Sequence, residues 1–234
     1  MAVAYQLLPF LVFVVSIFLA GLVLKSDFRS SRHRVFAAFL CATALWGLTI
    51  FGMRSSPTLQ LAYQWEKWAL TVIAFTGILF YHFTIRFTDS YRGQWILRAF
   101  YALGVVAGVL SLLGLAATGM QVKFYGYAPV LGPAFPVYLF VAYAPTFIGL
   151  SVLFRARRRS KSADERNRIS YVLIGVALIV IGATTDFLPA LGVPLYPLGI
   201  VGELCFGILA TIAVTRYRLM DLRLVCSAVL LTHL

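Results

Sequence analysis

The chain has 234 residues, of which 61% are hydrophobic and only 12% are charged. A soluble globular domain is nearer half apolar and a quarter charged, so a mean hydropathy of +0.90 excludes an ordinary water-soluble enzyme. The net charge of +12 would suggest a nucleic-acid partner for a soluble protein. In a membrane protein the positions of the charges are more informative than their sum. We therefore expect the lipid bilayer as the solvent and no nucleic-acid partner.

Seven stretches are long and apolar enough to cross a bilayer, since a spanning helix needs about 20 apolar residues for about 30 Å of hydrocarbon. They cover residues 5–24, 35–53, 68–86, 99–119, 136–154, 169–189 and 195–215. Their length and their lack of strict alternation argue against membrane β-strands. The sequence predicts an all-α integral membrane protein, a seven-transmembrane helix bundle that forms one domain over residues 1–215.

The basic residues predict how this bundle is oriented. Only three of the loop cations fall on the side expected to be outside: Arg54, Lys67 and Lys123. The opposite side carries Lys25, Arg29, Arg32, Arg34, Arg86, Arg92, Arg98, Arg155, Arg157, Arg158, Arg159, Lys161, Arg166, Arg168, Arg216, Arg218 and Arg223. Short cytoplasmic loops are rich in Lys and Arg. We predict that the N-terminus is outside and that the C-terminus is cytoplasmic.

The titratable residues form no recognisable catalytic or metal-binding pattern. His33, His82 and His233 are too scattered for a zinc site or a bis-His haem. No lysine falls mid-membrane for a Schiff base. The cysteines, Cys41, Cys205 and Cys226, leave the outer loops without a thiol, so we expect no disulfide. The sequence predicts no metal, no cofactor and no catalytic residue.

Acidic residues inside the predicted spans are more informative, because a carboxylate there must face protein or water. Glu203 falls within the seventh span and is interpreted either as an anchor for a ligand or proton-linked switch, or as a protonated side chain bonded within the bundle. Asp186 falls near the outer end of the sixth span, where it is either part of a ligand site or a solvated or turn-capping residue. Glu66 is expected to be a surface charge at the outer interface.

The loop over residues 120–135 combines β-forming residues with Gly and Pro, which predicts a short hairpin or lid across the outer mouth; an interfacial aromatic loop is the alternative. Trp46 falls mid-span, and its ring N–H needs a partner, so we expect it to face the bundle. These positions predict a ligand pocket in the outer half of the bundle. The candidate ligand-binding residues are Trp46, Tyr63, Tyr125, Tyr127, Asp186 and Glu203.

The segment after the last span, residues 216–234, is expected to continue the seventh helix into the cytoplasm as the stub of a signalling helix. Its apolar end at Leu234 predicts a chain cut within an element. The residues expected to transmit a signal are Arg216, Tyr217, Arg218, Leu219, Asp221 and Leu222.

Four stretches carry a resemblance to a known family. They are Phe80 to Phe87, Tyr125 to Tyr138, Glu165-Arg166-Asn167-Arg168 leading to Tyr171, and Leu188-Pro189 through Pro194 and Pro197 to Arg216-Tyr217-Arg218-Leu219-Met220-Asp221-Leu222. With these stretches the chain resembles the seven-transmembrane N-terminal sensor region of bacterial membrane histidine kinases over nearly its whole length.

The resemblance implies a multi-pass protein of the bacterial inner membrane that acts as the input module of a two-component system. It implies a hydrophobic small-molecule ligand or a membrane signal, a kinase or other cytoplasmic output in cis or in trans, and a homodimer. The chain departs from such kinases because it has no phosphoacceptor helix and no ATP-binding domain, so we expect no enzyme activity from these residues. The alternatives are a small seven-helix transporter or channel, and a membrane enzyme or structural subunit.

Overall fold

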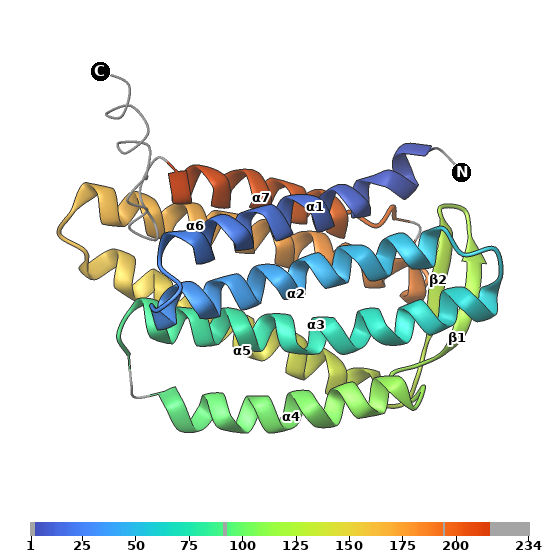
Figure 1. Ribbon diagram of the computed structural model, residues 1–234. Coiled ribbons are helices and arrows are strands. Elements are labelled where there is room, and N and C mark those ends of the chain that lie inside the picture. Colours follow the sequence, from blue (N-terminus) through green and yellow to red (C-terminus); the bar gives the residue numbers. More distant parts are fainter. Residues whose placement is uncertain (1–2, 91–92, 194, 216–234) are drawn as a thin grey trace, which may run out of the picture.

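The computed structural model describes residues 3–90, 93–193 and 195–215, which form seven α-helices and one β-hairpin (Figure 1). The helices are α1 (Val3–Ser26), α2 (Ser31–Arg54), α3 (Leu59–Phe87), α4 (Gln94–Leu112), α5 (Phe135–Arg159), α6 (Ala163–Phe187) and α7 (Gly199–Thr215). The strands β1 (Ala117–Lys123) and β2 (Gly126–Leu131) follow α4, and a 3-10 turn, η2 (Leu188–Leu191), follows α6. Six of the described helices are long and apolar enough to cross a membrane. The described apolar part of α7, Gly199–Ala213, is shorter.

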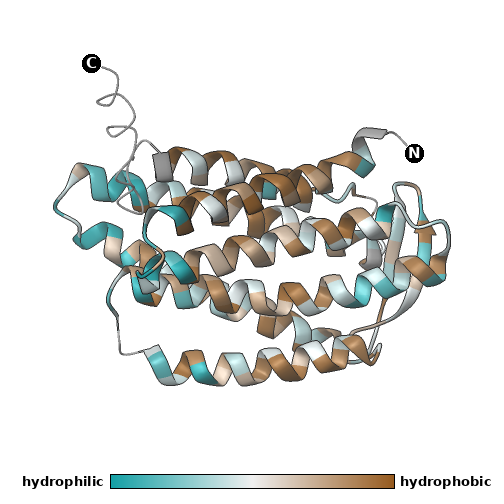
Figure 2. Ribbon diagram, in the orientation of Figure 1, coloured by the Kyte–Doolittle hydropathy of each residue, from teal (hydrophilic) through white to brown (hydrophobic). Residues whose placement is uncertain are grey.

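The helices run along one common direction and form a ring with one helix outside it (Figure 1). Around the ring, α1 packs against α2, α2 against α3, α3 against α5, α5 against α6, α6 against α7, and α7 against α1. Helix α4 lies outside the ring against α3 and α5. Hydrophobic residues occupy the middle of the bundle, and hydrophilic residues gather at its two ends (Figure 2). This distribution is the one that a bilayer requires of a bundle that crosses it.

A cluster of aromatic side chains fills the half of the bundle away from the hairpin. Phe39 is central, because its ring centroid lies 5.8 Å from that of Phe80 on α3 and 5.6 Å from that of Phe206 on α7. Phe36 and Phe83 extend the cluster with centroids 4.7 Å apart. All five rings are buried. The cluster ties α2, α3 and α7 together on this side of the ring.

The hairpin closes the other end of the bundle, which we call the hairpin end. Strands β1 and β2 pair antiparallel, with Lys123 opposite Gly126, so that two residues form the loop. Gly126 takes a φ of +135°, a conformation that suits a residue without a side chain. The Tyr127 hydroxyl donates to the carbonyl of Ser56 at 3.0 Å, and the Tyr63 hydroxyl donates to that of Ala117 at 2.8 Å. These bonds fix the hairpin across the helix ends, as the lid prediction requires.

The predicted bounds of the fourth span, 99–119, are wrong at the C-terminal side. Helix α4 ends at Leu112, and residues 117–119 belong to β1. The end is a Schellman motif: the Leu115 amide donates to the Leu110 carbonyl at 2.9 Å, and the Gly114 amide to the Ser111 carbonyl at 3.0 Å. Gly114 has the left-handed φ of +79° that this motif needs. An apolar run therefore crosses from helix to strand without a change in composition.

Each helix also begins at a residue other than the first of its predicted span, and two of these differences have a clear local cause. Helix α3 begins at Leu59 rather than at 68, because Thr58 caps it by accepting a hydrogen bond from the Leu61 amide at 3.2 Å. Helix α7 begins at Gly199 rather than at 195, after the proline at 197. The residues predicted to transmit a signal, Arg216, Tyr217, Arg218, Leu219, Asp221 and Leu222, lie outside the described part of the chain.

Candidate ligand-binding site

A cavity of about 140 Å³ lies inside the ring in the half that the hairpin covers. It runs along α2 from Thr43 to Arg54 and along α3 from Glu66 to Gly77. At 1.5 Å per helical residue, each side is about 16 Å long. Residues of α1, the hairpin, α5, α6 and α7 complete the lining. A cavity of roughly 150 Å³ holds a molecule the size of benzene, so this space suits a small molecule.

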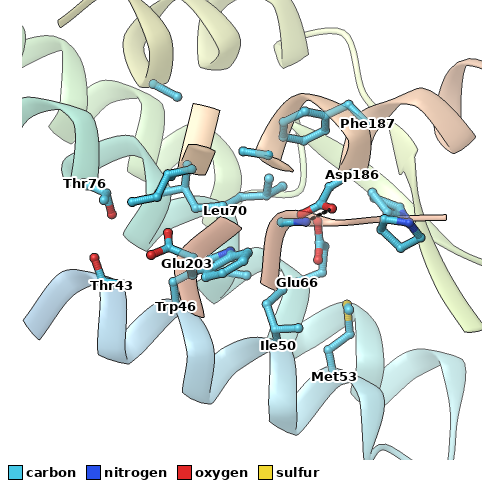
Figure 3. Close-up of a pocket in the computed structure, with 18 of the residues that line it drawn as sticks. Thr43, Trp46, Ile50, Met53, Glu66, Leu70, Thr76, Asp186, Phe187 and Glu203 are labelled. Atoms are coloured by element: carbon cyan, nitrogen blue, oxygen red, sulfur yellow. Dashed lines mark hydrogen bonds between the residues drawn. The ribbon is translucent and has the colours of Figure 1, made fainter. Parts of the chain in front are cut away.

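The deeper part of the cavity presents two buried polar groups without a partner. Glu203 of α7 is 7% exposed and Trp46 of α2 is 6% exposed. Among the described residues, the Oε2 atom of Glu203 and the Nε1 atom of Trp46 have no hydrogen-bond partner. In Figure 3 the Glu203 carboxyl points to the side of the cavity where Thr43 and Thr76 lie. The site therefore offers a hydrogen-bond acceptor and a donor to any occupant.

Two further carboxyl groups, those of Asp186 and Glu66, line the cavity nearer the hairpin. Asp186, at the end of α6, accepts a hydrogen bond from the Gly199 amide at 2.8 Å, which is drawn as a dashed line in Figure 3. Asp186 also interacts electrostatically with Glu66 and with Glu203. Glu66 is buried in the cavity lining, so its prediction as a surface charge is wrong. The sequence placed Glu66 at the interface, but the hairpin covers that part of α3.

Arg54 supplies the positive charge at the hairpin end of the cavity. Its Nη1 atom donates to the Tyr5 carbonyl at 2.9 Å, and its guanidinium carbon lies 3.8 Å from the centroid of the Tyr5 ring. It was predicted as a charge of an outer loop, but it is buried. Because an arginine stays protonated in proteins, it contributes a permanent charge to this lining.

Tyr5 and Tyr125 line the cavity at the hairpin, and the Tyr196 ring packs against both. The Tyr196 ring meets that of Tyr5 edge-on at 5.8 Å and that of Tyr125 at 6.2 Å. Burial raises the pKa of Tyr125 to about 12, so its hydroxyl is neutral.

Five of the six residues predicted for a pocket line this one cavity: Trp46, Tyr125, Tyr127, Asp186 and Glu203. Tyr63 does not line it. Its hydroxyl is bonded to the carbonyl of Ala117, and its ring packs with the cluster around α3, α4 and α5. The sequence analysis missed Tyr5, Arg54 and Glu66. Tyr5 and Arg54 fall near helix ends and Glu66 lies about two turns into α3, and the sequence gives no sign that the fold will bury them.

The carboxyl groups do not form a metal site. Within the part of the chain that the structure describes, no three His, Cys, Asp or Glu residues are grouped closely enough to hold a metal ion. The arrangement is that of a pocket for an organic molecule, with apolar walls and a few polar groups.

Comparison with known families decides what kind of region carries this pocket. The family described as the N-terminal 7TM region of histidine kinase matches residues 8–223. The chain belongs to this family. In such a kinase the 7TM region receives the input and is not the catalytic part. The match to residues 8–223 does not include a kinase domain. The bundle is thus a multi-pass membrane region of seven helices. A comparison with curated proteins gives no match.

Proposed function

We propose that this chain is the sensor of a histidine kinase in a bacterial inner membrane, and that a small amphipathic molecule bound in the cavity is its signal. The observation that carries the proposal is the make-up of the cavity lining. The lining includes Gly199 and Glu203 of α7, which is the last described helix and precedes any cytoplasmic output. A ligand that contacts Glu203 therefore contacts the element that leads toward the kinase.

The distribution of charge supports an orientation with the hairpin outside. The last turn of α5 carries Arg157, Arg158 and Arg159, and the last turn of α1 carries Lys25, all at the end opposite the hairpin. Cytoplasmic ends of membrane helices are rich in such residues. In this orientation the hairpin that covers the cavity faces the outside of the cell, where a signal arrives.

Transmission depends on a difference in affinity between two packings of the bundle, since a ligand that binds both equally shifts nothing. Among the described elements, helix α7 packs mainly against α6 and α1, and its first residue is held by Asp186. A ligand that engages Glu203 or Asp186 changes the forces on α7 directly. We propose that α7 then shifts against α1 and α6 within a homodimer and that residues 216–222 carry the shift onward.

A substitution that fills the cavity tests this function without knowledge of the ligand. Ala183 of α6 lines the cavity, and Ala102 of α4 is exposed on the outside of the bundle. The chain is joined to its cytoplasmic kinase, and autophosphorylation is measured in membrane vesicles. We expect Ala183→Leu to change the basal activity and to remove its response to culture extracts, while Ala102→Leu behaves as wild type. Equal activity and equal response of both variants would contradict the proposal.

A further inference from the structure

The cavity lining contains more acidic than basic side chains. Three carboxyl groups, those of Glu66, Asp186 and Glu203, line the cavity together with one guanidinium, that of Arg54. Asp186 interacts electrostatically with all three of the other groups. Arg54 balances at most one carboxylate. The other two carboxyl groups must either hold a proton or face a cation that enters the cavity, because charges are not left unpaired at such depth.

A second observation shows that a polar group belongs in the cavity. The Nε1 atom of Trp46 and the Oε2 atom of Glu203 are on side chains that are more than nine-tenths buried, line the cavity and have no partner among the described residues. The Nε atom of the buried Arg54 is also without one. Buried polar atoms are almost always bonded, so these positions indicate an occupant that carries polar atoms of its own.

The remaining walls define the body of that occupant. Leu70 and Ile73 of α3, Ile50 of α2 and Phe187 of α6 present apolar surface. The rings of Trp46 and of the tyrosines add faces that attract a cation. An apolar body with one positive group matches both the walls and the excess of carboxyl groups, whereas an anion or a strongly hydrated metal ion matches neither.

We infer that the cavity binds a compact organic cation, a protonated amine on an aromatic or branched aliphatic body, whose ammonium group pairs with Glu203. Its size is roughly that of a molecule with six to ten non-hydrogen atoms, because cavities near this volume hold benzene. This inference rests on the proposed function, since it names the chemical class of the signal that the sensor receives.

Three probes of similar shape and different charge test the inference. They are 2-phenylethylamine, the neutral 2-phenylethanol and the anionic phenylacetate. The full chain is placed in nanodiscs of zwitterionic phosphatidylcholine, empty nanodiscs measure partition into lipid, and calorimetric titration at pH 7.4 gives each dissociation constant. We expect the amine to bind at least tenfold more tightly than the alcohol and the acid not to bind. An alcohol that binds as tightly as the amine would overturn the inference, and so would tighter binding of the acid.

A substitution that keeps the shape of the Glu203 side chain tests whether its carboxyl group recognises the positive charge of the amine. Glu203→Gln is expected to reduce the preference for the amine over the alcohol to less than threefold while the alcohol still binds. Asp164→Asn removes an equal charge from the exposed first turn of α6 and is expected to keep the full preference. A preference that survives Glu203→Gln would contradict the assignment to Glu203. The probe series on the unmodified chain decides the ligand class even if the variant does not fold.

The outcome is separable from the test of the sensor function, because binding is measured without any kinase. If cavity filling at Ala183 alters autophosphorylation and yet the amine shows no preference, this inference fails and the sensor function stands. If the amine binds selectively and autophosphorylation never changes, the sensor function fails and the binding site stands.

Discussion

Asp186 and Gly199 join the last turn of α6 to the first turn of α7. The Oδ1 atom of Asp186 accepts a hydrogen bond from the Gly199 amide at 2.8 Å, so a carboxyl group that lines the cavity also caps α7, the last described helix. The neighbouring Thr185 hydroxyl accepts from the Leu198 amide at 2.8 Å. Two successive amides at the N-terminus of α7 are therefore satisfied by α6. Any movement of Asp186 upon ligand binding acts directly on the position of α7.

Gly199 has no room for a side chain, because a Cβ atom there would collide with the Asp186 carboxyl. We expect Gly199→Ala to destabilise the bundle by about 1–3 kcal/mol, the usual cost of overpacking. Gly21 of α1 has nothing within 4 Å of the equivalent position. Gly21→Ala should be neutral or stabilising, because alanine favours a helix. Thermal unfolding in detergent compares the two, and an unchanged midpoint for Gly199→Ala would show that the contact is dispensable.

Tyr127 holds the hairpin to the turn between α2 and α3 through the bond to the Ser56 carbonyl. Tyr127→Phe removes only this hydrogen bond, which contributes about 1 kcal/mol. Hydrogen exchange of the β2 amides should then become roughly three- to tenfold faster, because the hairpin opens more often. Val122→Thr, a change at an exposed side chain of β1, serves as the control and should leave these rates unchanged. Equal exchange in all three proteins would mean that Tyr127 does not hold the lid.

Glu203 is expected to cost stability, because a buried carboxyl atom without a partner is unfavourable. Replacement of buried ionic groups by apolar side chains of similar volume is often neutral or stabilising, by up to about 1–4 kcal/mol for an ion pair. We expect Glu203→Met to raise the midpoint of thermal unfolding and to abolish binding of the amine probe. Asp164→Leu, at the exposed start of α6, should change neither. A lower midpoint for Glu203→Met would indicate that Glu203 makes a structural bond within the bundle.

The orientation of the bundle can be tested by cysteine labelling. With Cys41, Cys205 and Cys226 replaced by serine, a single cysteine is placed at Val122 in the hairpin or at Lys161 between α5 and α6. The positive-inside rule predicts that a membrane-impermeant maleimide labels Val122→Cys in intact cells and labels Lys161→Cys only after lysis. The reverse pattern would place the cavity on the cytoplasmic side and remove the basis for an external signal.

Sequence patterns predicted the helices and the hairpin well, because span length and turn chemistry are local properties. They placed Trp46 and Glu203 in one cavity because polar groups in a membrane span face the interior of the bundle rather than lipid. They failed where long-range packing decides. Arg54 is the last residue of α2, and Glu66 lies before the predicted start of the third span, where side chains normally meet water. Only the fold shows that the two side chains are buried.

The end of α4 illustrates the same limit. Residues 99–119 are continuously apolar, and the change from helix to strand depends on the left-handed Gly114 and its Schellman bonds. Tyr63 was grouped with the pocket because of its aromatic side chain and its position toward the outer side of the predicted bundle. Its ring instead packs toward β1, where its hydroxyl donates a hydrogen bond to the Ala117 carbonyl. A sequence gives the helix and its depth, but it does not give the face that each side chain presents.

The measurement that tests the account most directly is autophosphorylation of the chain joined to its kinase in vesicles, titrated with 2-phenylethylamine. We predict that activity changes with the same midpoint as binding to the chain alone. In Glu203→Gln both midpoints should shift at least threefold to higher amine concentration, whereas Asp164→Asn should keep the wild-type midpoints. Activity that stays constant while the probe saturates the cavity would contradict the claim that this cavity is the input of the sensor.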